Sequence, residues 1–287
     1  MVALGSVRSC AVTTLALCLA STWPSRPDAS GRRVLLVEAD PAGGTLAAAS
    51  GWAAEPSLVS LDAAARRGGE AALVWEHCQS LPGGAAALAA PGGAEQAAGA
   101  LGMLAGLLGC LGGLDADVVV DCGRLDPASP ALSLWERADR AVLAVRPRLA
   151  DLAALATWLE GRPPGGDRLG LVVVGDGPYP DTEITDALGV EVLARLPWDP
   201  PAAAALASVP ASARQLRLAP LVRAGRTLAE RLAADLARLP APDGPSIAAS
   251  GQTARPGGPP VRAGVLRGWA RTRAASTNGS TAEEVTS

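Results

Sequence analysis

Short runs of β-branched and other apolar residues alternate along this chain with longer stretches rich in alanine and leucine. The runs occupy residues 34–37, 118–120, 141–145, 171–174 and 190–194. Continuous apolar runs of this length are typical of strands buried on both faces, as in parallel sheets. Helical spacing marks the stretches at 10–22, 60–77, 95–113, 149–160 and 212–238. This order predicts an α/β fold with a doubly wound, mostly parallel sheet flanked by helices.

The chain changes character after Leu239. Residues 240–287 are rich in Pro, Gly, Ser, Thr and Arg and hold few large apolar side chains, so this segment cannot offset its ordering entropy. We therefore predict one domain over residues 1–239 and a disordered tail over 240–287. Within the tail, residues 261–273 place apolar side chains and Trp269 at helical spacing among arginines, which makes a membrane surface one candidate partner. A solvated linker is the alternative.

Composition excludes several chemistries. The chain has no lysine, so all its basic residues are arginine, and Schiff bases and the phosphate-binding lysine of ordinary P-loops are excluded. A single histidine, His77, excludes a His-rich metal site. Five scattered cysteines without a CxxC pair favour a reducing compartment over a disulfide framework. The net charge of -3 does not indicate nucleic acid as a partner.

Two segments imitate membrane signals. Arg8 precedes an apolar run over residues 10–20, as in a signal peptide, and residues 97–114 form an uncharged run. The second run is largely alanine and glycine with leucines at helical spacing, so we interpret it as a helix of the domain. We interpret the first run as the helix of the first βα unit. We expect a cytoplasmic protein, with attachment to the inner membrane face through the tail as an alternative. An unrelated or exported α/β protein is a further alternative.

Acidic residues follow the ends of two predicted strands: Glu38 and Asp40 after the first run, and Asp121 after the second. The carboxyl ends of parallel strands share one edge of a sheet, where ligands bind. Upstream, a small-residue loop leads into a helix with Thr13 and Thr14 in its first turn. Such a helix start offers free N–H groups to an anion, and a threonine hydroxyl with a nearby carboxylate is a usual way of holding phosphate-bound Mg²⁺.

These residues resemble the ParA/MinD family of P-loop ATPases over roughly residues 1–235. Four segments carry the resemblance, in the family's order. They are the end of a phosphate loop at 13–17, a switch strand with its Asp-x-Asp-Pro-like turn at 34–44, a Walker B strand at 118–121, and a late strand with a Pro-x-Asp-Pro turn at 193–200. The resemblance implies a P-loop NTPase-like fold with ATP and Mg²⁺ as ligands.

By this resemblance, Thr13 would bind Mg²⁺, Asp121 would hold water ligands of the metal, and Asp40 would orient the attacking water. Thr14 would contact an inner phosphate. The nucleotide-binding residues implied are, in full, Arg8, Ala11, Val12, Thr13, Thr14, Asp121 and Pro197. Purely structural roles are the alternative for each: the threonines begin a helix, Asp121 ends a strand, and Asp40 caps a turn.

The sequence departs from the family's pattern where the chemistry is most demanding. The family has a lysine directly before the first threonine, a glycine before that and a second lysine near the loop's start; here these places hold Val12, Ala11 and Val7. Arg8 is the only cation in the loop. Glu38 replaces an aspartate of the switch pair, and residues 175–176 replace an adenine-reading asparagine. The lysine-dependent mechanism is excluded, which leaves at best a slow ATPase.

Two functional readings remain open within the resemblance. One is a degenerate relative that acts as an interaction scaffold or weak nucleotide-dependent switch in partitioning or positioning, chromosome partitioning included, with a protein partner. The other is an ATP-binding ATPase that forms a homodimer. The bias toward alanine, arginine and glycine is typical of a high-GC bacterium.

Overall fold

The computed structural model describes residues 1–24, 33–66, 71–81, 83–106, 111, 114–160, 168–207 and 213–239. The strands are β1 (Val2–Ser6), β2 (Arg33–Glu38), β3 (Gln79–Ser80), β4 (Ala86–Leu88), β5 (Ala116–Arg124), β6 (Arg140–Val145), β7 (Leu169–Val174) and β8 (Val192–Leu196). The helices are α1 (Val12–Thr22), α2 (Leu46–Ser50), α3 (Leu58–Ala65), the 3₁₀ helix η1 (Ala71–His77), α4 (Ala94–Gly106), α6 (Leu132–Arg137), α7 (Leu149–Glu160), α8 (Asp181–Leu188), α9 (Pro200–Ala207), α10 (Ala213–Leu218) and α11 (Pro220–Ala237).

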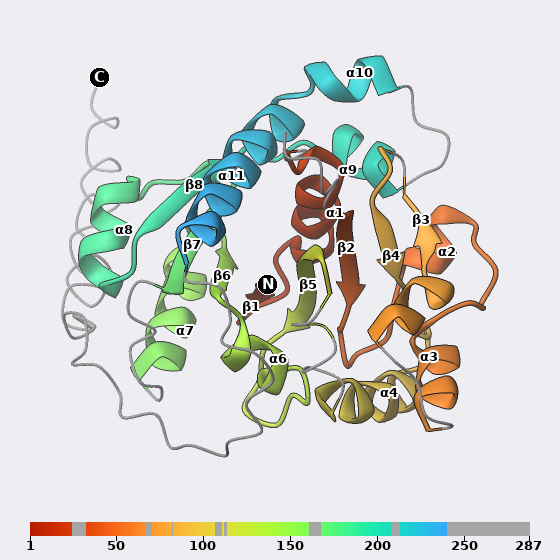
Figure 1. The fold of residues 1–287 in the computed structure, drawn as a ribbon. Helices are drawn as coiled ribbons and strands as arrows, with labels where there is room; N and C mark the ends of the chain where they lie inside the picture. The colour runs from red at the N-terminus through yellow and green to blue at the C-terminus, as the bar shows by residue number, and fades with distance from the viewer. Residues whose placement is uncertain are drawn as a thin grey trace, which may run out of the picture.

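The strands form one eight-stranded sheet in the order β3-β4-β2-β5-β1-β6-β7-β8 (Figure 1). Neighbouring strands are parallel except for the antiparallel pair β3 and β4. β1 lies between β5 and β6, so the N-terminal segment supplies a central strand. The doubly wound α/β fold predicted from the sequence is confirmed.

Helices cover both faces of the sheet because the strands are apolar on both faces. In β1, Ala3 packs into the hydrophobic cluster that includes residues of α3, α4, α6, α7 and α8. Its neighbour Leu4 packs into the other cluster, with residues of α1, α9 and α11. Successive strand residues point to opposite faces, so an unbroken apolar run fills two cores at once.

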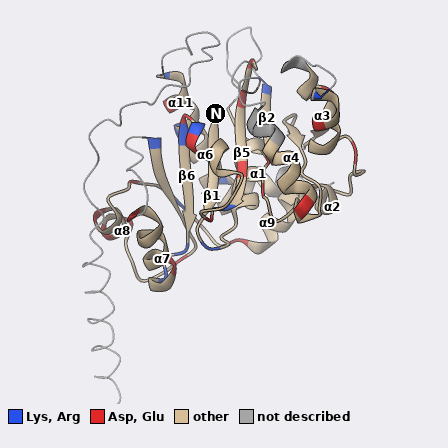
Figure 2. Ribbon diagram, turned by 90° about the horizontal axis from the view of Figure 1, so that it is seen from below, with Lys and Arg blue, Asp and Glu red and all other residues tan. Residues whose placement is uncertain are grey.

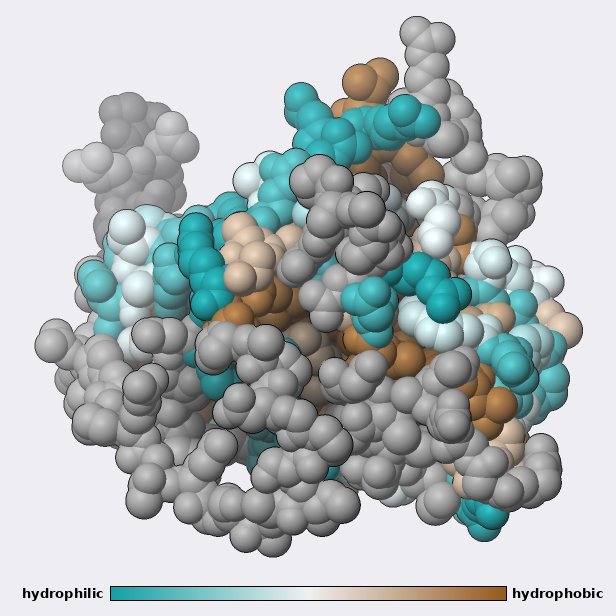
Figure 3. All heavy atoms as spheres, in the orientation of Figure 1, coloured by the Kyte–Doolittle hydropathy of each residue, from teal (hydrophilic) through white to brown (hydrophobic). Residues whose placement is uncertain are grey.

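Charged side chains and surface hydrophobic groups follow this arrangement. Figure 2 shows most of the strands' length free of charge, with basic and acidic residues at strand ends and on helices. On the face seen in Figure 3, hydrophobic colour reaches the surface over α10, where hydrophilic residues flank it. Leu218 of α10 is 71% exposed, so this short helix contributes an apolar group to the surface rather than to the core.

Two predicted helices differ in the structure. Within the stretch 60–77, α3 ends at Ala65 and the 3₁₀ helix η1 begins at Ala71, and residues 67–70 lie outside the described ranges. The stretch 212–238 becomes α10 and α11, which meet at Ala219 and Pro220. Proline can begin a helix but cannot continue one, because it lacks an N–H and its ring clashes with the turn before it. The pair β3 and β4 and the short helices α2, α6 and α8 were not predicted.

Residues 97–106 of the uncharged run lie in α4, whose residues Ala97 and Leu101 are fully buried. None of the helices in the described ranges is long and apolar enough to cross a membrane. The predicted tail at 240–287, with its candidate membrane segment at 261–273, lies outside the described residues.

Candidate functional site

The loop between β1 and α1 ends in a left-handed residue at the start of the helix. Ala11 adopts the left-handed region (φ 46°, ψ 29°), and its carbonyl accepts a hydrogen bond from the N–H of Leu15 at 2.9 Å, which starts α1. No side chain caps this helix start. The first N–H groups of α1 therefore point out of the helix without a side-chain acceptor, where an anion can meet them.

The residue that follows Ala11 turns inward. Val12 is only 6% exposed and belongs to the hydrophobic cluster shared by α1, α9 and α11. A valine cannot donate a hydrogen bond, so the first helical residue adds packing and no charge to the loop. Thr13 and Thr14 follow in the first turn, both half-buried.

Three carboxylates converge beside this loop at the ends of β2 and β5. Glu38 is paired in register with Asp121, which is itself opposite Leu4 of β1. Asp40 follows two residues after Glu38 and interacts electrostatically with both other carboxylates. The convergence predicted from the strand ends is therefore present in the fold.

Asp121 is fully buried, and burial raises the pKa of its carboxyl to about 7. Its Oδ1 accepts from the N–H of Gly123 at 2.9 Å, and a hydrogen bond from the Thr13 side chain also favours the charged form. Its Oδ2 has no partner with full hydrogen-bond geometry among the described residues. A buried oxygen without a full set of hydrogen bonds raises the free energy of the folded state, so Oδ2 of Asp121 can still accept a further donor or cation.

Glu38 has a structural role that the sequence did not reveal. Its Oε1 accepts from the N–H groups of Thr45 (2.7 Å) and Leu46 (3.1 Å), and its Oε2 accepts from Ala90 (3.0 Å). Burial raises the pKa of this carboxyl, while the three backbone donors oppose the shift. Glu38 thus ties the start of α2 and the segment after β4 to the end of β2.

Asp40 is half-buried and accepts a hydrogen bond from the N–H of Ala42 at 2.8 Å. Its carboxyl group lies directly against Gly123, where an added Cβ would collide with it. Gly123 also has a φ of 59°, which favours glycine. The close approach of β2 and β5 ends therefore depends on a glycine directly after Cys122.

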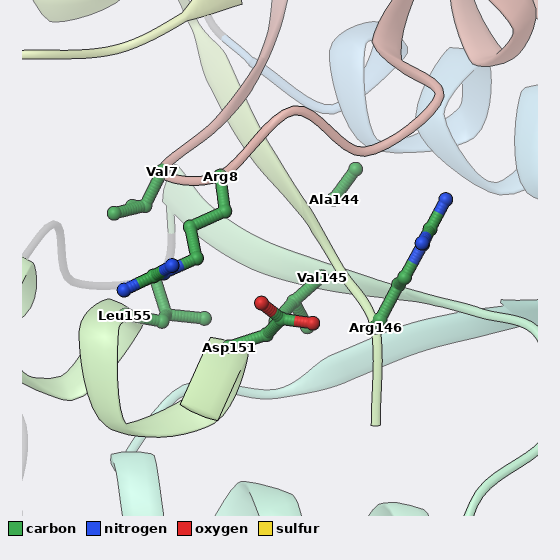
Figure 4. A pocket seen from close by; sticks show the side chains of 7 residues that line it. All are labelled: Val7, Arg8, Ala144, Val145, Arg146, Asp151 and Leu155. Atoms are coloured by element: carbon green, nitrogen blue, oxygen red, sulfur yellow. The ribbon is translucent and has the colours of Figure 1, made fainter. Parts of the chain in front are cut away.

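Arg8 and Arg146 lie at the loop and extend in different directions (Figure 4). A cavity of about 10 Å³, with room for about one water molecule, is lined by Val7, Arg8, Ala144, Val145, Arg146, Asp151 and Leu155 (Figure 4). In this view Arg8 extends toward Leu155 of α7, away from the start of α1, while Arg146 extends along the loop toward its turn into α1. The loop's own arginine is therefore directed elsewhere in the structure, and a second arginine, which sequence reasoning did not select, lies beside the loop.

The late turn after β8 reaches the same edge of the sheet. Pro197 is half-buried, and Trp198 is 57% exposed with the Arg146 guanidinium 4.7 Å from the centre of its ring. Asp199 caps α9 by accepting from the N–H of Ala202 at 3.1 Å. The only advance signal for Arg146 was its place, directly after the apolar run 141–145 and before Pro147.

The loop after β7 forms a hollow of about 340 Å³ with Arg195, over residues 176–181. Arg195 donates to the carbonyls of Gly175 (3.0 Å) and Tyr179 (2.9 Å) and to the carboxylate of Asp181. This arginine links β8 to the β7–α8 connection, and its guanidinium is hydrogen-bonded to protein groups.

The donor set at the loop suits Mg²⁺ only together with a bound molecule. Within the described part of the chain, no group of three His, Cys, Asp or Glu side chains is arranged to hold a metal. The Thr13 hydroxyl and the underbonded Asp121 carboxylate are hard oxygen groups, and Mg²⁺ usually completes its shell with water and phosphate oxygens. These residues therefore fit Mg²⁺ as a companion of a phosphate ligand.

Solved structures with this arrangement of strands and helices exist. The ParA family ATPase of Chlorobium tepidum superposes with a TM-score of 0.65 at 16% identity, over 80% of this chain and 98% of its own. The chain has the fold of the ParA and MinD ATPases. MinD of Pyrococcus furiosus superposes with a TM-score of 0.60 at 19% identity, covering 81% of this chain and 98% of that one. No protein-family model matches the sequence, and no curated protein is significantly similar to it.

A third structure with the ParA/MinD fold is a Cyanothece McdA variant, with one aspartate replaced by alanine, in complex with ATP. It superposes with a TM-score of 0.58 at 17% identity, over 81% of this chain and 95% of that one. All three comparisons cover nearly the full length of the other chain. The shared fold is therefore that of the whole ParA/MinD domain rather than of a fragment of it.

Proposed function

We propose that this protein is a ParA/MinD-like protein with a degenerate phosphate loop, acting as an interaction scaffold or weak nucleotide-dependent switch in the positioning or partitioning of cargo. One observation carries the proposal. The loop keeps a left-handed turn and an uncapped helix start, yet Val12 is buried in the core where the family has its lysine. The backbone groups that would bind a phosphate are retained, but the lysine that would pair with it is absent.

The ligand we propose is ATP with Mg²⁺, bound weakly. Among the structural neighbours, the McdA variant of Cyanothece is in complex with ATP and MinD of Pyrococcus horikoshii with Mg-ADP. In this chain, Thr13 and Asp121 would hold the metal, and the N–H groups at the start of α1 would meet the phosphates. Thr14 and Pro197 would line the remainder of the site. The bound metal would supply charge neutralisation at the phosphates.

The partners we propose are a cargo or adaptor protein and, in the switch form, a second copy of the chain. The neighbour MinD of Aquifex aeolicus forms a complex with MinC. A membrane surface reached through residues 261–273 is a further proposal, and nucleic acid is not part of it.

An active, dimerising ATPase is the second candidate. It is supported by the closeness of Thr13 and Asp40 to Asp121, and in this candidate Asp40 would orient the attacking water. Against it stands the absent lysine, whose charge in a water-excluding site is worth several kcal/mol of ligand or transition-state stabilisation.

Calorimetry with Mg²⁺-ATP tests the proposal. We expect a dissociation constant weaker than roughly tens of micromolar, because the cation that would meet the terminal phosphates is missing. The double variant Ala11→Gly with Val12→Lys should bind at least about tenfold more tightly, and Ala11→Gly with Val12→Met, which adds no charge, should not. Sub-micromolar binding by the unaltered protein, together with steady hydrolysis, would favour the ATPase instead.

A further inference from the structure

Arg146 is placed beside the loop by the pairing of the two central strands. β6 pairs in parallel with β1, with Leu4 opposite Val142 and Gly5 opposite Leu143, so both strands end at the same edge. Arg146 follows the last residue of β6. Its guanidinium interacts electrostatically with the thiol of Cys10, the residue before Ala11. The guanidinium therefore lies near Cys10, and in Figure 4 the Arg146 side chain extends toward the turn into α1.

The Arg146 guanidinium has an N–H donor that no described protein group accepts from. Its Nε is buried and has no hydrogen-bond partner among the described residues, and no described carboxylate forms an ion pair with it. The Trp198 ring holds the guanidinium through its face, and stacking leaves the in-plane N–H groups free. Arg195 provides the contrast, because its guanidinium is bonded to two carbonyls and a carboxylate.

Other unsatisfied polar groups lie on the central strands β1 and β5 and at the start of α1. The Ser6 hydroxyl, fully buried at the end of β1, has no partner within the described residues, and neither has Oδ2 of Asp121 by full hydrogen-bond geometry. The N–H groups that open α1 lack a side-chain cap. Buried polar atoms without partners are rare in native proteins, so unsatisfied atoms at this edge of the sheet are consistent with a ligand that completes them.

Charge explains why a cation from outside the loop is needed. Glu38, Asp40 and Asp121 gather at this edge, and a polyphosphate brought there meets their repulsion. Val12 offers no compensation, and Arg8 extends toward α7. Among the described arginines, Arg146 combines proximity to the turn, free donors and a fixed orientation.

We propose that Arg146 is the phosphate-binding cation of this protein, supplied by β6 in place of the lysine that the chain lacks. Its in-plane N–H groups donate to oxygens of a polyphosphate seated on the start of α1, while Trp198 holds the guanidinium in place. The proposal rests on the proposed function in one respect, because it requires that the loop bind a phosphate ligand. It deepens that function by assigning phosphate recognition to the junction of β1, β6 and β8.

The test uses the full chain, with Mg²⁺-ATP and inorganic tripolyphosphate as probes in calorimetry up to millimolar concentration. Tripolyphosphate lacks a base, so it separates phosphate contact from stacking on Trp198. Arg146→Gln should weaken binding of both probes by about tenfold to a hundredfold, the range expected for a charge-assisted hydrogen bond. Arg146→Lys should retain most of the affinity, because it keeps the charge.

Two matched controls accompany these variants. Arg148→Gln removes an exposed arginine from the same connection and should bind within about twofold of the unaltered protein. Arg8→Gln removes the loop's own cation and should lose much less affinity than Arg146→Gln, because Arg8 extends toward α7 (Figure 4). Circular dichroism establishes that each variant folds. Should Arg146→Gln fail to fold, Trp198→Ala at its exposed site gives the second measurement, with a several-fold loss of both probes expected.

The proposal is overturned if Arg146→Gln binds like the unaltered chain, or if the loss appears in Arg8→Gln instead. It is also overturned if the unaltered protein binds neither probe at millimolar concentration. That last result leaves the scaffold reading standing, because a scaffold needs no nucleotide. Failure of this inference and failure of the proposed function are therefore distinguishable.

Discussion

At the scale of single residues, Ala11 has a strained backbone conformation at the start of α1. It is the sole non-glycine residue with positive φ among those the structure describes. An L-residue in the left-handed region loses about 1–2 kcal/mol relative to the right-handed one. Such strain persists where the surrounding structure determines the backbone, and it gathers at ligand sites. The turn is thus held by β1, α1 and their packing rather than by the preference of the residue in it.

Ala11→Gly should raise the free energy of unfolding by about 1 kcal/mol, because glycine adopts this backbone without strain. Urea denaturation measures the change. Ala234→Gly, at an exposed position inside α11, is the control and should lower the free energy of unfolding by about 1 kcal/mol. A loss of stability in Ala11→Gly would contradict the strain argument.

Asp121 makes stability depend on pH. In the folded protein burial raises the pKa of its carboxyl to about 7, from an ordinary value of 3.8. Between these values the folded state keeps a proton that the unfolded state has released. The free energy of unfolding should therefore fall as pH rises from about 4 to about 7 and level off above that.

Asp121→Asn should reduce this slope, because the amide does not titrate. Denaturant titrations between about pH 4.5 and pH 8, in a chelator and without nucleotide, measure it. Asp186→Asn on the exposed face of α8 controls for the loss of a charge elsewhere. Part of the slope should remain in Asp121→Asn, since burial also raises the pKa of Glu38. An unchanged slope would mean that Asp121 is ionised in the folded protein.

At the scale of elements, the contact between α1 and α11 fixes the position of the helix that follows the β1–α1 loop. Gly225 of α11 faces Cys18 of α1 so closely that an added Cβ would collide with the sulfur. Cys18 is fully buried, and its thiol donates to the carbonyl of Leu221 at 3.7 Å. This close approach positions α1, and with it the N–H groups that face the candidate ligand.

Gly225→Ala should lower the free energy of unfolding by about 1–3 kcal/mol, because overpacking a tight contact outweighs the better helix propensity of alanine. Adding Cys18→Ala should recover most of the loss, since it removes the sulfur that collides. Thermal and chemical denaturation of both single variants and the double variant form the cycle. Simple additivity of the two changes would rule out a direct contact as the cause.

At the scale of the whole molecule, α11 completes the second face of the sheet. Its buried side chains, Leu221, Val222, Leu228 and Leu232 among them, close the core over α1 and end shortly before Leu239. The domain boundary at residue 239 stays a prediction, and it falls just after this last described core helix. It can be tested by shortening the chain.

A chain that ends at Leu239 should melt within about 2 °C of the full chain, because no described core contact is removed. Differential scanning calorimetry of the two proteins measures this, and a large drop would place part of the tail in the core. The same pair tests the membrane proposal: vesicles with anionic lipid at low salt should sediment the full chain more than the short one. Equal sedimentation would end that proposal.

The sequence by itself determined the layers of the fold and the edge at which the site lies. Continuous apolar runs indicated strands buried on both faces, and the acidic residues at their ends had to gather because parallel strands finish on one side. The resemblance to the ParA/MinD family implied that Thr13 and Asp121 would serve one Mg²⁺ site. The sequence alone also showed that the chain has no lysine and that Val12 precedes the first threonine of the loop.

Only the tertiary structure decided which partner each polar group has. Glu38 binds three backbone N–H groups of segments distant in sequence, Arg8 turns to α7, and Arg146 reaches the loop from β6. These contacts depend on strand order and register, which are set by the packing of the whole sheet. Local patterns encode which residues are buried, but long-range packing decides what they touch.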